Sequence, residues 1–391
     1  MRIAILRRAR HASFSMDVYA DALIAGLHQV RPEWEIVELF PQDRIQGNRT
    51  NSLLKGLQKY YQRYRQYPQQ LKAHLADVYH IVDHSDGYLV THLKQHKAPT
   101  VVTCHDVINL IHPELFLDRA RFPKLSMATW KRSLRRMCEA DRVITVSQHT
   151  AKDVVAHLPL NSAKVTVIPN GVESSFSPLD PAETARFRES LGIPPEICCL
   201  LNVGSNNPRK NIITILKSLD RLLQKRALVH FCKAGDDFTA AQTAFIRDRN
   251  LADHITYLGK PDKDTLQKIY NAADILVAPS TYEGFGITVL EAMMCGLPTI
   301  TSNVTSLPEV AGDAAILIDP LDTAALCEAI ERLHNDPQLK QSLIHKGRAR
   351  AQTFTWENTA EQVAQTYECL TQNKLSRSSS APAVDERVNA L

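Results

Sequence analysis

The sequence predicts an α/β protein made of two tandem Rossmann-like domains that face each other across a cleft. Short apolar, β-branched runs alternate with amphipathic stretches of helix length, which is the pattern of parallel sheets covered by helices. This series of runs occurs twice. A chain of 391 residues is also long enough to form two hydrophobic cores.

Each unit is predicted from its series of buried strands, most of them separated by a helical pattern. In the first unit the strands are Ile3–Leu6, Val78–Val82, Thr100–Cys104, Val143–Val146 and Val165–Ile168. In the second they are Cys198–Val203, Leu228–Phe231, Ile255–Leu258, Ile275–Ala278, Thr299–Thr301 and Ala315–Ile318. Strands that alternate with helices indicate parallel order in both sheets.

The boundary between the units is predicted at Asn170-Gly171-Val172, because a polar, proline-containing run follows it. The first domain is therefore residues 1–172 and the second is residues 173–355, followed by a helix at about 356–372. The remaining residues, 373–391, are polar and lack hydrophobic periodicity, so we expect a disordered tail.

Composition limits the class of protein. The 46 basic and 42 acidic residues give a charge of +4, which does not indicate nucleic-acid binding. Eight cysteines without a CxxC motif indicate reduced, mostly buried thiols. Arg2 is the only basic residue before the apolar run Ile3–Leu6, and that run is too short for a signal peptide or a membrane span. We expect a cytoplasmic protein, with peripheral contact to the inner face of a membrane left open.

The most informative stretch is a glycine turn between a predicted strand and a helix. Gly284 and Gly286 allow close approach of the backbone, and the amides that open the following helix favour an anion such as a diphosphate. Glu291 lies about one turn into that helix. A site for a phosphorylated ligand is therefore expected here.

This stretch resembles the retaining group 1 glycosyltransferases, family four of the glycosyltransferase classification, whose signature is two glutamates separated by seven residues. Glu283 and Glu291 match that signature. The flanking matches are Gly284, Phe285, Gly286 and Ile287. The resemblance implies a GT-B fold, with Glu291 on the donor ribose hydroxyls and Glu283 beside the donor sugar.

A basic pair supports the resemblance. Arg209 and Lys210 follow Gly204 and the first strand of the second unit, where the family places an Arg-Lys pair on the donor diphosphate. A guanidinium forks onto phosphate oxygens, and an ammonium supplies a point charge. The alternative is a solvated pair at a helix start.

His105 ends a strand of the first unit, and ligands of open parallel sheets bind beyond the carboxyl ends of strands. The resemblance implies that His105 lies beside the donor sugar, without acting as a general base. It also implies that Tyr257 and Leu258 frame the nucleotide base and that the helix at 356–372 returns to the first domain.

The acceptor half departs from the family. Many members have a glycine pair after the first strand, whereas this chain has Arg7, Arg8 and Arg10. These arginines are candidates for an acidic or phosphorylated acceptor, or they form a solvated loop. The acceptor, whether lipid, glycan or small molecule, is not identified by the sequence.

The segment 53–67 combines leucines and tyrosines with lysines and arginines and contains no acidic residue. Such a segment binds an anionic bilayer, or it packs its apolar side on the first domain.

No metal and no cofactor are expected. His80/His84 and His92/His96 have a helical metal-ligand spacing without obvious partner ligands, and Asp262-Lys263-Asp264 is interpreted as a helix cap. Arg209 and Lys210 with helix-start amides would stabilise the departing diphosphate instead of a metal.

Three other classes of protein are alternatives to a transferase. A dehydrogenase is disfavoured because no G-x-G-x-x-G follows a predicted strand. A glycosyl phosphorylase has the same architecture, but its cofactor lysine is not identifiable. A non-catalytic nucleotide-sugar-binding or scaffold protein stays as the alternative to a transferase.

Overall fold

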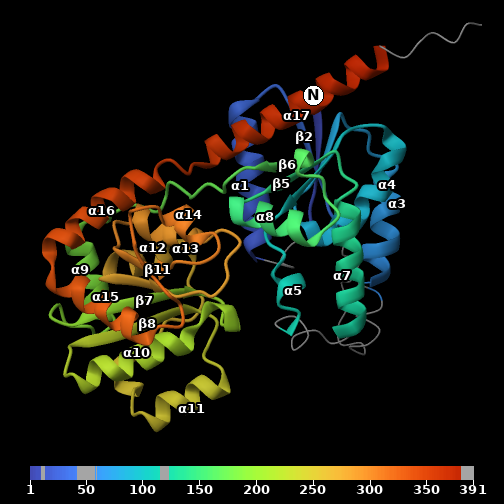
Figure 1. Ribbon diagram of the computed structural model, residues 1–391. Coiled ribbons are helices and arrows are strands. Elements are labelled where there is room, and N and C mark those ends of the chain that lie inside the picture. The colour runs from blue at the N-terminus through green and yellow to red at the C-terminus, as the bar shows by residue number, and fades with distance from the viewer. Residues whose placement is uncertain (10–13, 42–57, 59, 115–122, 380–391) are drawn as a thin grey trace, which may run out of the picture.

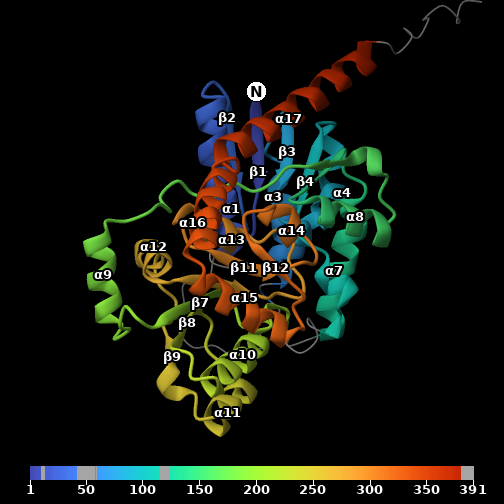
Figure 2. The same ribbon diagram turned by 60° about the vertical axis from the view of Figure 1, so that its left-hand side comes forward.

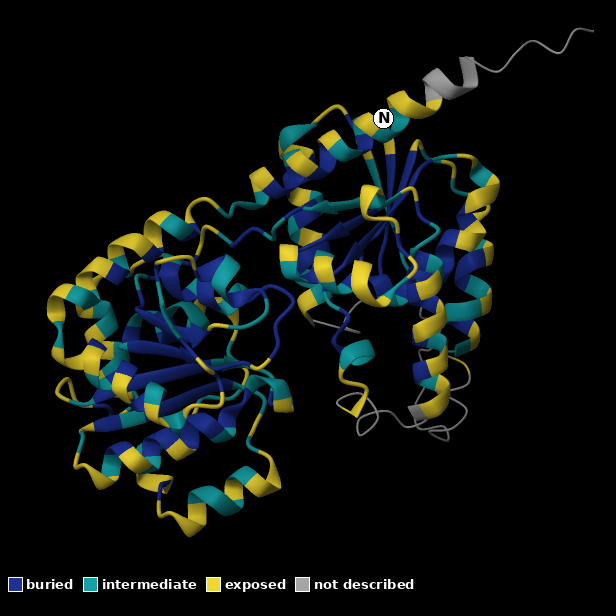
Figure 3. Ribbon diagram, viewed as in Figure 1, coloured by how far each residue is buried: buried dark blue, intermediate teal, exposed yellow. Residues whose placement is uncertain are grey.

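The computed structural model describes residues 1–9, 14–41, 58, 60–114 and 123–379. Over these residues the chain forms two α/β domains, each built on a parallel sheet of six strands (Figure 1). Both sheets are buried, and the helices around them turn their exposed sides outward (Figure 3). The predicted fold class, two Rossmann-like units, is confirmed.

The first sheet has the order β2-β1-β3-β4-β5-β6 and the second has the order β12-β11-β10-β7-β8-β9. The strands of the first are β1 (Arg2–Leu6), β2 (Glu35–Leu39), β3 (Val78–Ile81), β4 (Thr100–Cys104), β5 (Arg142–Thr145) and β6 (Val165–Val167). Those of the second are β7 (Cys198–Gly204), β8 (Val229–Gly235), β9 (Ile255–Tyr257), β10 (Ile275–Ala278), β11 (Thr299–Ser302) and β12 (Ile316–Ile318).

Helices and short turns connect the strands. The first domain contains α1 (Phe14–Val30), η1 (Gln62–Gln66), α3 (Tyr67–Leu71), η2 (His84–Leu89), α4 (Val90–Leu93), η3 (Lys94–His96), α5 (Ile108–Ile111), α7 (Pro123–Met137), α8 (Gln148–His157) and η4 (Ser162–Lys164). The second contains α9 (Pro181–Ser190), η5 (Pro208–Lys210), α10 (Ile212–Gln224), α11 (Ala240–Asp248), η6 (Ala252–His254), α12 (Lys263–Ala272), α13 (Ile287–Met294), α14 (Leu307–Ala311), α15 (Thr323–Asn335) and α16 (Pro337–Ala351). The chain ends with α17 (Trp356–Ser379).

Local side-chain chemistry defines several helix starts. Ser147 caps α8 by accepting the Thr150 amide at 3.0 Å. Asp262 caps α12 by accepting the Thr265 amide at 2.8 Å, which confirms the predicted cap. Side chains of this kind satisfy backbone donors that a helix leaves without a partner in its first turn.

The strand order locates a crevice in each sheet. The order reverses between β7 and β10 in the second sheet and between β1 and β3 in the first. Open parallel sheets bind ligands outside the carboxyl ends of the strands at such points, since the connecting loops diverge there. The loops that follow these four strands are thus where a site is expected.

Two features at the ends of the domains differ from the sequence prediction. Strand β2 was not predicted, and it forms an edge of the first sheet by pairing with β1. Helix α17 continues to Ser379, past the predicted end at 372, because no glycine or proline interrupts that stretch. The rest of the predicted tail, 380–391, lies outside the described residues.

Helix α17 crosses from the second domain and packs on the first, beside α1 (Figures 1 and 2). Val363 and Tyr367 are fully buried in the same core cluster as Ile3 and Ile5. The Tyr367 hydroxyl also lies 2.5 Å from His80 Nδ1. The last helix thus completes the hydrophobic core of the first domain.

Two chain segments cross between the domains side by side. The Val172 amide donates to the Phe354 carbonyl at 2.8 Å, and Val172 forms a bridge with Thr355. A Cβ atom at Gly171 would lie 2.2 Å from the Trp356 nitrogen, so the glycine is required by the close approach of the two segments. These paired segments connect the two domains and are called the hinge below.

Candidate active site

The loop from β10 to α13, residues 279–286, forms the centre of the site and is called the donor loop below. Gly286 adopts φ +106° directly before α13, and a Cβ atom there would lie 2.8 Å from Leu307 Cδ2. Both the left-handed backbone and the close contact require glycine. Helix α13 thus begins directly after the loop that follows β10, so its first amides are candidates for binding an anion.

Glu283 lies in the donor loop and is held by two cations. Arg209 Nη1 lies 2.5 Å from Glu283 Oε2, and Lys210 Nζ lies 2.7 Å from Oε1. The Ser280 hydroxyl donates to Oε1 at 2.8 Å. Burial raises the pKa of Glu283, but the charges of Arg209 and Lys210 outweigh this effect and lower the pKa to about 2. Glu283 is therefore ionised at every physiological pH.

The basic pair sits on η5, beyond the carboxyl end of β7. Arg209 Nη1 also donates to the Tyr282 carbonyl at 2.9 Å, which fixes the guanidinium to the donor loop. The Arg209 and Lys210 side chains are only 21% and 13% exposed. The two side chains thus face Glu283 and the crevice, which disfavours the alternative of a solvated pair.

Gly204, the last residue of β7, lies beside this pair. It has φ +131°, and its Cα faces the end of the Lys210 side chain, since a Cβ atom there would lie 3.4 Å from Lys210 Cε. The fully buried Lys233 donates from Nζ to the Gly204 carbonyl at 3.3 Å. Burial is the largest of the effects that lower the pKa of Lys233 to about 8, and the charge of Lys210 acts in the same direction, whereas that of Asp236 opposes it.

Glu291 lies on α13, where the Tyr270 hydroxyl donates to Oε2 at 2.7 Å. Burial raises the pKa of Glu291 to about 7, and the charge of Glu173 acts in the same direction. Of the two signature glutamates, Glu283 is thus held ionised by cations, whereas Glu291 changes charge near neutral pH. The same carboxyl group thus has a lowered pKa in one environment and a raised pKa in the other.

Tyr257 and Leu258 lie at the end of the edge strand β9, separated from β7 by β8. The Tyr257 hydroxyl donates to the Gly235 carbonyl at 2.9 Å, and its side chain is 40% exposed. The Leu258 amide donates to the Lys233 carbonyl at 2.8 Å. Both residues lie at the carboxyl end of the parallel sheet, as Gly204 does.

His105 directly follows β4, at the carboxyl end of the first sheet, and is buried. Its Nε2 lies 2.8 Å from the Val82 carbonyl, and because a carbonyl only accepts, Nε2 carries the proton. Burial lowers the pKa of His105, although the hydrogen bond to Val82 opposes the shift. The ring also contacts the edge of Tyr19, with centroids 4.7 Å apart.

The two domains meet at Gly284. A Cβ atom there would lie 2.0 Å from the His105 carbonyl oxygen, so only glycine allows the donor loop to approach His105 this closely. The Ser147 hydroxyl donates to the Gly284 carbonyl at 2.7 Å. The structure thus brings together Glu283, Gly284, Arg209, Lys210 and His105 from two domains.

The predicted acceptor arginines have different environments. Arg7 is buried, and its guanidinium binds Asp17 at 3.1 Å, Asp21 at 2.5 Å and Glu38 at 2.7 Å. These carboxylates occupy the donors that an acceptor would use, so Arg7 ties β1 to α1 and β2 instead. Arg8 stays partly exposed beside Asp83, at 3.3 Å. Arg10 lies outside the described residues.

Two further functional candidates, Asp83 and His84, follow β3 and were not predicted from the sequence. Asp83 is buried, and the charges of His84 and Arg8 lower its pKa although burial raises it. His84 lies between His105 and Trp130, with ring centroids 6.5 Å and 6.0 Å away. The signal was the position of Asp83 and His84 at the carboxyl end of a predicted strand.

His80 and His84, which have a helical metal-ligand spacing in the sequence, have different surroundings in the fold. His80 points into the core, where its Nε2 lies 2.7 Å from the Thr103 hydroxyl, whereas His84 lies at the sheet edge. Within the described ranges, no group of three histidine, cysteine or carboxylate side chains is arranged to hold a metal ion.

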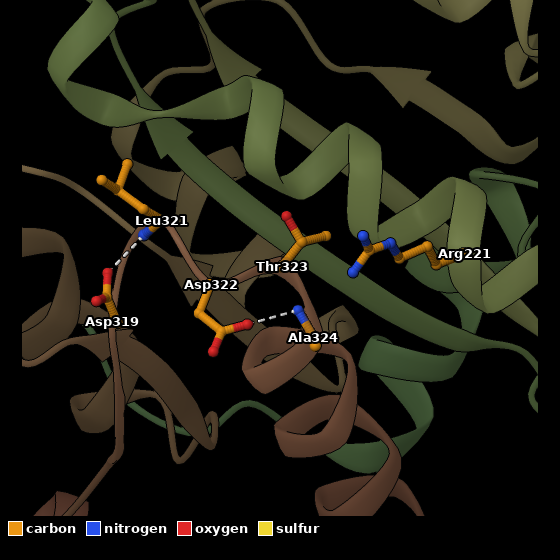
Figure 4. Close-up of a pocket in the computed structure, with 6 residues that line it drawn as sticks. All are labelled: Arg221, Asp319, Leu321, Asp322, Thr323 and Ala324. Carbon is orange, nitrogen blue, oxygen red and sulfur yellow. Dashed lines mark hydrogen bonds between the residues drawn. The ribbon is translucent and has the colours of Figure 1, made fainter.

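A pocket of about 530 Å³ opens where β12 leads into α15 (Figure 4). It is lined by Arg221, Asp319, Leu321, Asp322, Thr323 and Ala324. Asp322 accepts the Ala324 amide at 2.8 Å, and Asp319 accepts the Leu321 amide at 2.8 Å. The two carboxylates stabilise local backbone, and the lining includes none of the predicted site residues, so we assign no function to this pocket.

The segment 53–67 is described only at residue 58 and from 60 onward. There Arg63 turns inward and pairs with the buried Asp86 at 2.6 Å, while Tyr61 and Arg65 are exposed. In the described part of the chain, no helix has both the length and the apolar character needed to cross a bilayer.

Comparison with known proteins agrees with this geometry. Residues 183–350 match the family model of glycosyl transferases group 1, and residues 18–176 match that of Glycosyltransferase Family 4. The chain is 29% identical over 302 residues to O-antigen chain mannosyltransferase B of Escherichia coli, which covers 76% of each chain. It spans only 34% of the length of another relative, the serotype-specific mannosyltransferase WbdA of E. coli.

Solved structures share the fold over nearly the whole chain. Sucrose-phosphate synthase from Thermosynechococcus elongatus has a TM-score of 0.74 at 22% identity, covering 95% of this chain and all (100%) of that one. Anabaena HepE in complex with UDP has a TM-score of 0.73 at 18% identity, covering 94% of this chain and 100% of that one. The two family models, each matching one half of the chain, mark it as a glycosyltransferase whose second domain matches group 1, and the solved structures show that its fold is GT-B.

Proposed function

We propose that this chain transfers a sugar from a nucleoside-diphosphate sugar to an acceptor hydroxyl, with retention of configuration at the anomeric carbon. The observation that carries the proposal is the ion-paired cluster of Glu283, Arg209 and Lys210 at the crevice between β7 and β10, with Glu283 in the loop that leads directly into α13. Two cations and a helix N-terminus form a binding site suited to a diphosphate.

The main requirement of this reaction is that the site stabilises the negative charge that develops on the leaving diphosphate. Arg209 and Lys210 would shift from Glu283 toward the phosphate oxygens, and the fixed amides of α13 would add to their effect. We propose that these groups act without a divalent metal. Glu291 would accept the ribose hydroxyls, and Tyr257 with Leu258 would border the base.

On the opposite side of the cleft, His105 would contact the donor sugar. Its Nε2 proton is already donated to Val82, which leaves Nδ1 as a hydrogen-bond acceptor for a sugar hydroxyl. Because burial lowers the pKa of His105, the ring would be neutral in this role.

The relatives support the donor class without fixing the base or the sugar. Anabaena HepE binds UDP, and the E. coli relatives are named as mannosyltransferases. We propose that the acceptor binds at the facing edge of the first sheet, near Arg8, Asp83 and His84, where charged and aromatic groups surround the crevice between β1 and β3.

We further propose that the enzyme is cytoplasmic and contacts an anionic membrane through the segment 53–67. The exposed Tyr61 and Arg65 support this contact, because exposed aromatic rings and cations favour the interface of an anionic bilayer. Arg63 would not take part, since it pairs with Asp86.

A panel of nucleotide sugars tests the proposal. A donor should raise the melting temperature by mass action, and Lys210→Ala should reduce the shift. Lys260→Ala is the matched control, because Lys260 is 74% exposed and pairs with Asp236. The anomeric configuration of the product, measured by proton NMR, tests retention. Binding of a donor without hydrolysis or transfer to any acceptor would favour a non-catalytic binding protein.

A further inference from the structure

The start of helix α8 of the first domain contacts α14 of the second (Figure 1). The Glu309 carboxylate accepts the Gln148 amide with both oxygens, at 2.8 and 2.9 Å, and the His149 amide at 3.3 Å. Glu309 thus satisfies the first two amides of a helix that belongs to the other domain. Such amides have no partner within their own helix.

The same helix binds the donor loop. Ser147 and Thr150 donate their hydroxyls to the Gly284 carbonyl at 2.7 and 3.1 Å. Farther along the helix, Asp153 accepts the Tyr282 hydroxyl at 2.5 Å. One helix of the first domain therefore contacts both α14 and the residues on either side of Glu283.

Each of these contacts exists only while the domains are together. A carboxylate on the first amides of a helix also interacts favourably with the positive end of the helix dipole. When the domains separate at the hinge, the amides and the carboxylate must both return to water. The contact consequently favours the arrangement in which Gly284 lies against His105.

We infer that Glu309 is a positioning residue, which holds the domains closed by capping α8 across the cleft and so keeps His105 beside the donor loop. It touches neither donor nor acceptor and acts through α8. The kinetic part of this inference rests on the proposed function, whereas the contact itself can be measured without any substrate.

Hydrogen exchange in the full chain tests the contact. In Glu309→Gln one acceptor oxygen becomes an NH₂ group that opposes the helix amides, so exchange at Gln148 and His149 should become about tenfold faster. Asp313→Asn is the matched control: it loses the same charge four positions later, at a side chain that is 81% exposed and pairs with Lys346. Exchange as slow in Glu309→Gln as in the unmodified protein would overturn the inference.

Gln148→Pro removes the same contact from the other side. Gln148 is the first residue of α8, where proline is tolerated, and Ser147 before it has the extended backbone that proline requires. We expect this variant to resemble Glu309→Gln, and the double variant to be no worse than either single one, because both lose one shared interaction. Additive effects would contradict a direct contact.

Kinetics then separate positioning from binding. With UDP and GDP as probes, calorimetry should give the same affinity for Glu309→Gln and for the unmodified protein, while kcat falls about tenfold. A kcat within about twofold of that of Asp313→Asn would refute the positioning role. If the unmodified protein transfers no sugar at all, the proposed function fails, and hydrogen exchange still decides whether Glu309 holds the domains closed.

Discussion

Replacement of Glu291 by glutamine should remove a loss of stability that the unmodified, ligand-free protein undergoes between mildly acidic and neutral pH. Burial raises the pKa of this carboxyl from 4.5 to about 7 in the folded protein. A raised pKa contributes stability that is complete below the unfolded pKa and is lost as the pH rises through the folded one. The loss falls between pH 4.5 and about 7.

The magnitude follows from the two pKa values. Between about pH 5.5 and 7 the carboxyl is already ionised in the unfolded chain but is still mostly protonated in the folded protein. The free energy of unfolding therefore falls by about 2 kcal/mol over this range, at about 1.4 kcal/mol per pH unit. Glutamine accepts the Tyr270 hydroxyl without titrating. The free energy of unfolding of Glu291→Gln relative to the unmodified protein should therefore rise by about 2 kcal/mol from about pH 5.5 to 8.5.

Urea-induced unfolding of both proteins at the two pH values measures this difference. Comparison of the two proteins cancels all other titrating groups. A relative stability that stays constant within about 0.3 kcal/mol would refute the raised pKa. The same variant should bind UDP or GDP more weakly, because it lacks the charge that strengthens hydrogen bonds from ribose hydroxyls.

Three further predictions concern the cleft. Gly284→Ala should reduce kcat at least about tenfold with nucleotide affinity retained, since its Cβ would clash with the His105 carbonyl; unchanged kcat would contradict the close approach. Arg209→Ala and Lys210→Ala should each lower kcat, and the double variant should depart from additivity by about 0.5–3 kcal/mol, as measured in a four-protein kinetic cycle. Full activity is expected in excess chelator, and a loss that magnesium or manganese restores would exclude the metal-free mechanism.

The sequence predicted the elements that carry a strong local pattern. Eleven predicted apolar runs became strands, because the inner strands of parallel sheets are covered on both faces and are apolar throughout; the edge strands β6 and β9 are only partly buried. Strand β2 was not predicted because Glu35 and Glu38 break up its apolar pattern. Such charged residues are tolerated in a strand at the edge of a sheet. Its place was set by pairing with β1, which no local pattern encodes.

The same distinction holds for the site. The glycine turn and the basic pair were recognisable because they are contiguous in sequence, whereas the capping of α8 by Glu309 joins residues 161 positions apart. Arg7 could not be told from Arg8 by residue type. The structure separates them, since the side chain of Arg7 turns toward three carboxylates and that of Arg8 toward the sheet edge.

Helix α17 has a consequence for how the protein is made. Because Val363 and Tyr367 belong to the core that contains β1, the first domain to leave the ribosome lacks part of its interior until the last segment of the chain has been synthesised. Until then His80 has no phenolic hydroxyl beside its Nδ1. The donor domain, whose helices and strands all precede Trp356, has no such delay among its described residues. We therefore expect the second half of the chain to reach its final packing before the first half does.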